Sequence, residues 1–107
     1  MMMPYLYLAV AIASEVVATS ALKASDGFTR PLPAVIVVVG YAIAFLLMAA
    51  SLKQLPVGFV YAIWAGLGIV GVAIVGALVF GEVFTPLKVV GIALVVAGVV
   101  VMKLGTA

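Results

Sequence analysis

Four long apolar stretches, separated by short polar segments, constrain the fold of this chain more than any other feature. They cover about residues 4–22, 33–52, 57–80 and 86–104 of the 107-residue sequence. An α-helix needs about 20 apolar residues to cross the hydrocarbon core of a bilayer. The strands of a membrane β-barrel alternate apolar and polar residues, whereas residues 35–39 are all valine or isoleucine. We therefore predict an all-α integral membrane protein, with residues 1–107 forming one domain of four transmembrane helices.

The composition excludes several other classes of protein. Hydrophobic residues make up 69% of the chain and charged residues 7%, whereas a soluble domain carries about 25% charged residues. The five basic residues are scattered and form no patch of the kind that binds nucleic acid. There is no cysteine or histidine, and the three acids lie far apart in the sequence. We therefore expect no metal, no other cofactor and no enzymatic centre.

The distribution of basic residues between the two membrane faces is nearly even. With four spans, Lys53 and Lys103 lie on one face, and Lys23, Arg30 and Lys88 lie on the other. An excess of lysine and arginine on the cytoplasmic side normally fixes orientation. The small difference predicts a dual-topology protein that forms an antiparallel homodimer. The alternative is a single orientation, set by the N-terminus and by the insertion machinery.

Glu15 is the one acid placed deep in an apolar stretch. It lies about 16 Å from the start of the first predicted helix, near the bilayer centre. A charged side chain there costs about 2.5–3.5 kcal/mol on insertion scales, and such residues usually serve a function. Lys23 is about 12 Å further along the axis, too far for an ion pair within the helix. We predict that protons and a cationic ligand compete for Glu15.

Small and aromatic residues accompany this acid. On the same helical face, Ala11 and Ala18 leave room beside Glu15, and Thr19 offers a hydroxyl group. Two pairs of rings occur on the second and third helices. Ring faces attract organic cations, although a single ring such as Phe45 also suits plain packing. The predicted pocket comprises Tyr5, Leu8, Ala11, Ile12, Ala18, Thr19, Tyr41, Phe45, Tyr61 and Trp64.

Glycines mark two further features. Gly66 and Gly68 lie in a glycine-rich part of the third helix and predict either a hinge or a close helix contact. Gly91 and Gly98 lie one heptad apart on the fourth helix, with few polar groups beside them. This stripe predicts a helix–helix seam, which we assign to dimerisation.

Several segments resemble the small multidrug resistance family along the whole chain. They are EVVATSALK at residues 15–23, GFTR at 27–30, LPVG at 55–58 and YAIWAGLG at 61–68. The resemblance implies a proton-coupled exporter in the bacterial inner membrane, which works as an antiparallel homodimer driven by the proton gradient. It also implies that Glu15 of each subunit binds proton and substrate in turn, and that Gly91 and Gly98 form the dimer seam.

The resemblance also bears on the substrate. Ala18 and Ala44 stand where the family's guanidinium exporters typically have tryptophan and serine. This favours the branch that exports quaternary ammonium and other lipophilic cations, although residues 85–88 look more like the guanidinium branch. Two alternatives stay open: a guanidinium/proton antiporter, and a small membrane subunit that transports nothing and for which Glu15 is dispensable.

Overall fold

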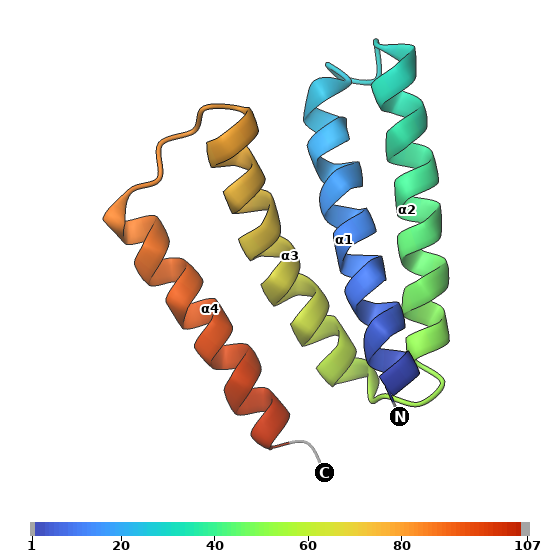
Figure 1. The fold of residues 1–107 in the computed structure, drawn as a ribbon, viewed down its shortest axis with the longest axis vertical. Coiled ribbons are helices and arrows are strands. Elements are labelled where there is room, and N and C mark those ends of the chain that lie inside the picture. Colours follow the sequence, from blue (N-terminus) through green and yellow to red (C-terminus); the bar gives the residue numbers. More distant parts are fainter. Residues whose placement is uncertain (1, 106–107) are drawn as a thin grey trace.

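Four helices make up most of residues 2–105, the part of the chain that the computed structural model describes (Figure 1). All four are long and apolar enough to cross a membrane. The predicted all-α fold with four transmembrane helices is therefore confirmed, and the pairing of two chains stays a prediction. The ends of the predicted domain, residue 1 and residues 106–107, lie outside the described residues. The helices are α1 (Met2–Ala24), α2 (Pro31–Ser51), α3 (Val57–Val79) and α4 (Pro86–Leu104).

The helix boundaries follow local backbone chemistry. α2 begins at Pro31, two residues before the predicted start, because a proline in the first turn gives up an N–H that would have no partner within the helix. At the start of α4, the Thr85 hydroxyl accepts a hydrogen bond of 3.2 Å from the Lys88 N–H. Gly81 (φ +69°) turns the chain at the end of α3. Proline, threonine and glycine at the helix ends thus help to limit the helices to the length of one span.

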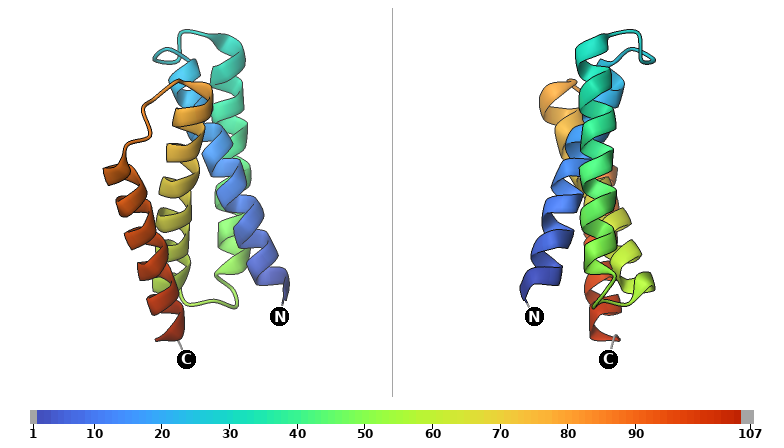
Figure 2. Two further views of the ribbon diagram at one scale, coloured as in Figure 1. Left: turned by 60° about the vertical axis from the view of Figure 1, so that its left-hand side comes forward. Right: turned by 90° about the vertical axis from the view of Figure 1, so that its right-hand side faces the viewer.

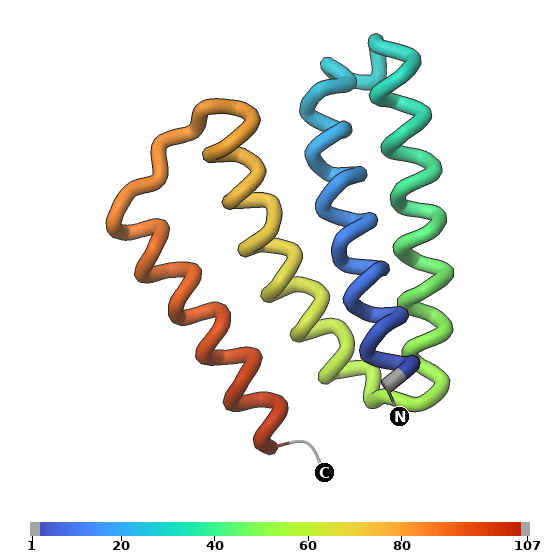
Figure 3. Tube along the Cα trace, viewed as in Figure 1, coloured from blue at the N-terminus to red at the C-terminus, as the bar shows by residue number. Residues whose placement is uncertain are grey.

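The helices form one thin layer, with overall dimensions of 45 × 34 × 18 Å (Figure 2). α1 packs against both α2 and α3, and α4 packs against the other side of α3. Consecutive helices run in opposite directions, so the start of α1, the end of α4 and the α2–α3 loop share one end of the bundle (Figure 3). α4 is an edge helix without a buried residue, and its outer side is free to face lipid or a second chain.

Small residues hold α1 and α2 close together. A Cβ built on Gly40 of α2 would lie only 2.8 Å from the Ala18 Cβ of α1. The Ser14 hydroxyl donates a hydrogen bond of 2.8 Å to the Gly40 carbonyl. Contacts of this kind are typical of membrane helix pairs, because small residues let the backbones approach. The tight pairing fixes the rotation of α1, and Glu15, the next residue after Ser14, is directed towards α3.

The glycines of α3 and α4 differ in what surrounds them. A Cβ on Gly66 would lie 2.6 Å from the Val99 Cγ2, so this glycine lets α4 approach α3. Gly91 and Gly98 have no atom of another residue within 4 Å of the Cβ position. Both glycines are exposed, and Gly91 also borders a second cavity with Ile69 and Ala73 of α3. The stripe is therefore open to a partner, as a helix–helix seam requires. The predicted use of this stripe in dimerisation is not tested by a single chain.

Candidate functional site

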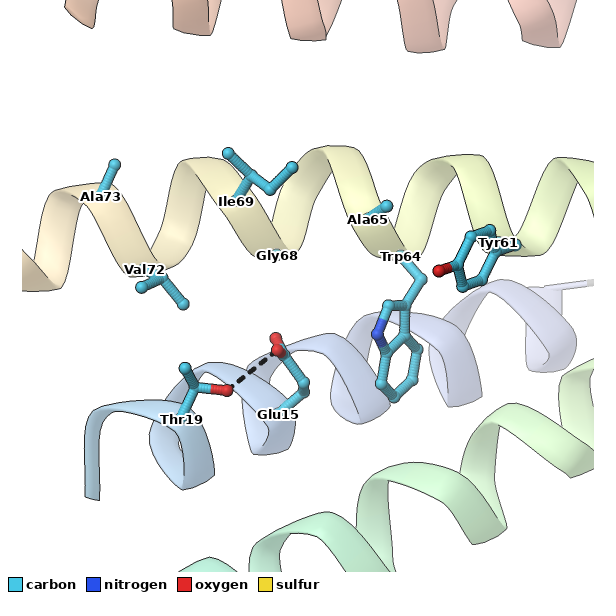
Figure 4. Close-up of a pocket in the computed structure, with 9 residues that line it drawn as sticks. All are labelled: Glu15, Thr19, Tyr61, Trp64, Ala65, Gly68, Ile69, Val72 and Ala73. Carbon is cyan, nitrogen blue, oxygen red and sulfur yellow. Dashed lines mark hydrogen bonds between the residues drawn. The ribbon is translucent and has the colours of Figure 1, made fainter. Parts of the chain in front are cut away.

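Glu15 lies on α1 with its carboxylate directed at Gly68 of α3 (Figure 4). A Cβ at Gly68 would lie 3.1 Å from the Glu15 Oε2, so the absence of a side chain there makes room for the carboxylate. Oε2 is buried and has no hydrogen-bond partner among the described residues. A buried polar atom without a partner costs free energy. A cationic ligand would supply the missing partner, and a proton would remove the buried charge.

The other oxygen of Glu15 receives a short chain of hydroxyl groups. The Thr19 hydroxyl, one turn further along α1, donates a hydrogen bond of 3.0 Å to Oε1. The oxygen of Thr19 is also 2.6 Å from the Tyr41 hydroxyl of α2. A threonine hydroxyl has one proton, so Tyr41 is the donor to Thr19. Thr19 is therefore the one hydrogen-bond donor to the carboxylate in the described part of the chain, Tyr41 orients it, and Oε2 stays without a partner there.

A cavity of about 520 Å³ opens beside this carboxylate (Figure 4). Cavities of about 300–1,000 Å³ accommodate drug-sized ligands. The wall is largely apolar, and Glu15 is the one acid in it, so the cavity suits a ligand that is bulky, apolar and positively charged. The lining residues are Glu15, Thr19, Tyr61, Trp64, Ala65, Gly68, Ile69, Val72 and Ala73.

Three aromatic rings form a stack that ends at the cavity. Trp64 of α3 lies parallel to Phe45 of α2, with ring centroids 5.7 Å apart and an angle of 15°. Phe45 stacks in turn on Tyr41, at 6.1 Å and 23°. The Trp64 side chain is buried and extends towards α1 (Figure 4). Packing on Phe45 thus fixes the indole in the cavity wall, where its ring face can attract a cation.

The predicted pocket residues separate into four groups. Thr19, Tyr61 and Trp64 line the cavity with Glu15, and Tyr41 and Phe45 act on it through the contacts described above. Tyr5 lies elsewhere, in contact with Phe59 and Lys103. The remaining four are buried in the packed core and do not line the cavity. They are Leu8, Ala11, Ile12 and Ala18.

The sequence interpretation missed four lining residues, Ala65, Ile69, Val72 and Ala73. Their spacing gives a signal that could have found them. Ala65, Ile69 and Ala73 continue from Tyr61 in steps of four, and Val72 lies one turn after Gly68, so they share two adjacent stripes of α3. As for the predicted hinge, α3 runs without interruption through Gly66 and Gly68. Bending there stays a prediction.

Gly68→Ala should weaken the binding of a lipophilic cation about threefold to tenfold. The added methyl group would lie 3.1 Å from the Glu15 Oε2 and push the carboxylate a few tenths of an ångström away from α3. The expected cost is about 0.7–1.4 kcal/mol, which corresponds to this loss of affinity. Gly58→Ala is the matched control, because the Cβ position of Gly58 has no neighbour within 4 Å. Equilibrium dialysis of tetraphenylphosphonium against solubilised protein measures the change, and equal affinity for the two variants would contradict this role of Gly68.

Comparison with known proteins places the chain in a family. The family model described as Small Multidrug Resistance protein matches residues 3–95. A multidrug transporter of Pseudomonas aeruginosa is 54% identical, over 94% of this chain and 91% of its own length. Quaternary ammonium compound-resistance proteins of Klebsiella aerogenes and Escherichia coli are 49% and 46% identical over the same shares of the two chains. The chain therefore belongs to the small multidrug resistance family of membrane transporters.

Proposed function

We propose that this protein is a proton-coupled antiporter that exports lipophilic and quaternary ammonium cations from the bacterial cell. The observation that carries the proposal is the buried Glu15 Oε2 without a partner, beside a largely apolar cavity of about 520 Å³. The names of the relatives support the substrate class, since two of them are quaternary ammonium compound-resistance proteins. The chain itself needs no further cofactor for this exchange, because the proton gradient supplies the energy.

The Glu15 carboxylate, with one oxygen hydrogen-bonded and the other without a partner among the described residues, explains how the movements of proton and cation are coupled. Its free oxygen can hold a proton or can balance the charge of a cation, but it does not do both at once. A neutral carboxylic acid no longer attracts the cation, so protonation on one side of the membrane releases the ligand. Loss of the proton on the other side restores the charged site. If the site faces the two sides of the membrane in turn, the entry of protons thus drives the exit of cations.

The walls of the cavity favour a bulky organic cation over guanidinium. A planar guanidinium ion carries three NH2 groups, hence six N–H donors, and needs several fixed acceptors around it. Ala18 and Ala44 are fully buried in the packed core and offer no such group. Tyr61 and Trp64 instead present ring surfaces to the cavity, which bind a cation without matching individual donors. The quaternary ammonium branch is therefore the better match.

An antiparallel homodimer would complete the site. The cavity lies between α1 and α3 and is open on one side, and the exposed Gly91–Gly98 stripe of α4 provides a surface for a second chain. Two chains inserted in opposite orientations form an inverted repeat, the arrangement that lets many transporters face either side of a membrane. The nearly even distribution of basic residues permits both orientations.

An imposed proton gradient tests the proposal directly. In proteoliposomes with an acidic interior, protons leave through the antiporter, and tetraphenylphosphonium should accumulate inside at least about fivefold above vesicles without a gradient. This is the expected direction because one ion moves down its gradient as the other moves up. A protonophore should abolish the accumulation, and protein-free vesicles give the background. Accumulation that is the same with and without the pH difference would contradict proton coupling. No transport at all would favour the alternative that the protein is a membrane subunit that transports nothing.

A further inference from the structure

Tyr5, Phe59 and Lys103 form a cluster that is separate from the cavity at Glu15. They bring together the start of α1, the start of α3 and the end of α4, which share one end of the bundle (Figure 1). The Lys103 ammonium is 2.8 Å from the Tyr5 hydroxyl and 4.5 Å from the centroid of its ring. It is also 5.4 Å from the centroid of the Phe59 ring. The cluster is therefore an ammonium ion held between a hydroxyl group and two aromatic rings.

This arrangement has the chemistry of a site for an organic cation. A cation within about 6 Å of a ring centroid is attracted by the charge distribution of the ring. The two rings are arranged edge to face, with centroids 6.5 Å apart, so they form a corner around the ammonium group. No acid in the described chain forms an ion pair with Lys103. The attraction thus comes from the rings and the hydroxyl group, and another cation could replace the lysine.

The exposure of the three side chains permits such a replacement. Phe59 is buried, with 3% of its surface exposed, and forms a fixed wall. Tyr5 is 41% exposed, and Lys103 is exposed at the end of its helix. A ligand can therefore reach the ring of Tyr5 from the surface while Phe59 stays in place. The long lysine side chain can move away without unpacking the helices.

We propose that Tyr5 and Phe59 form a peripheral binding site for organic cations, and that Lys103 is its internal competitor. The idea that such cations are ligands of this protein rests on the proposed function. Lys103 and an incoming cation both need the same ring faces and repel each other, so the lysine lowers the affinity of the peripheral site. Tyr5 is about 15 Å from Glu15 along α1, so the peripheral site is distinct from the central one.

The opposite end of the bundle provides a natural comparison. There the Lys23 ammonium of α1 lies 5.5 Å from the centroid of the Phe80 ring. This contact has one ring and no hydroxyl group at hydrogen-bond distance from the ammonium among the described residues. Neutralising Lys23 changes the net charge of the chain as neutralising Lys103 does, but it leaves no corner of two rings behind. Lys23→Gln is therefore a matched control for a general effect of charge.

The test is made in the Glu15→Gln background, which removes the charge of the central site. Adding Lys103→Gln should raise the affinity for tetraphenylphosphonium about threefold to tenfold, the range of a cation–ring contact. Lys103→Arg and Lys23→Gln in the same background should leave the affinity unchanged. Adding Phe59→Leu to the Glu15→Gln, Lys103→Gln variant should remove the gain. Equilibrium dialysis of the full-length solubilised protein gives each value.

A second measurement does not depend on how well those variants fold. In the Glu15→Gln protein, the ε-methylene protons of Lys103 should resonate upfield because they lie near two rings, and saturating tetraphenylphosphonium should move them to ordinary shifts. Unchanged shifts, no gain in Lys103→Gln, or an equal gain in Lys23→Gln would each overturn the peripheral site. Failure of the proposed central function would appear instead as a wild-type protein without proton-driven transport, and it would leave these outcomes unaffected.

Discussion

Replacing Glu15 by glutamine should lower proton-driven transport of tetraphenylphosphonium about thirtyfold or more, because losing one partner of a desolvated charge pair costs about 2–5 kcal/mol. Glutamine has nearly the same size as glutamate and can still accept the 3.0 Å hydrogen bond from Thr19. It cannot balance the charge of a cation, and it does not take up or release a proton at working pH. Uptake into proteoliposomes with an acidic interior, followed as an initial rate, measures the loss.

Glu82→Gln is the matched control for this substitution. It removes another carboxylate by the same chemical change, but Glu82 is exposed in the α3–α4 loop and lies against Gly76 rather than in the cavity at Glu15. We expect transport within about twofold of wild type for Glu82→Gln. Glu15→Asp keeps the charge but shortens the side chain, so it should retain partial transport. Wild-type rates in Glu15→Gln would contradict the central role of this acid.

The bilayer explains why the fold could be predicted from the sequence. A helix in lipid must satisfy its own backbone hydrogen bonds and must be about 20 residues long, so the lengths of the apolar stretches already define four spans. The ends were less predictable, because a proline such as Pro31 can belong either to the loop or to the first turn. Which helices pack together depends on side-chain contacts that periodicity does not reveal, such as Gly40 against Ala18.

In the candidate site, too, helical spacing predicted some features and side-chain packing decided the others. Glu15, Thr19, Tyr61 and Trp64 were predicted by chemistry and helical spacing, and all four line one cavity. Ala18 has the right spacing too, yet it faces α2, because the side of a helix that each neighbour covers is decided by packing.

The contact between Tyr5 and Lys103 joins residues at opposite ends of the chain. Spacing within one helix cannot reveal such a pair. Contacts between distant segments were therefore the part of the structure that could not be predicted from the sequence.

The affinity for tetraphenylphosphonium should rise steeply with pH, because each bound proton must leave before the cation binds. At pH values low enough to keep the carboxyl groups protonated, each proton released per bound cation changes the dissociation constant about tenfold per pH unit. Protonation occupies Glu15, so the direction is fixed: affinity falls as pH falls, and it becomes independent of pH once the carboxyl groups are ionised. The size of the slope then counts the carboxyl groups that take part.

If two chains share one ligand, the dissociation constant should depend on pH with a particular slope. In an antiparallel homodimer the cation displaces a proton from each of two Glu15 side chains, so the dissociation constant should change about a hundredfold per pH unit at the acidic limit. Titration calorimetry in buffers of different ionisation enthalpy counts the released protons independently. Glu82→Gln should keep the same slope, since that acid lies outside the cavity. A limiting slope of one proton would mean that a single Glu15 serves each cation, and a flat profile would contradict competition between proton and cation.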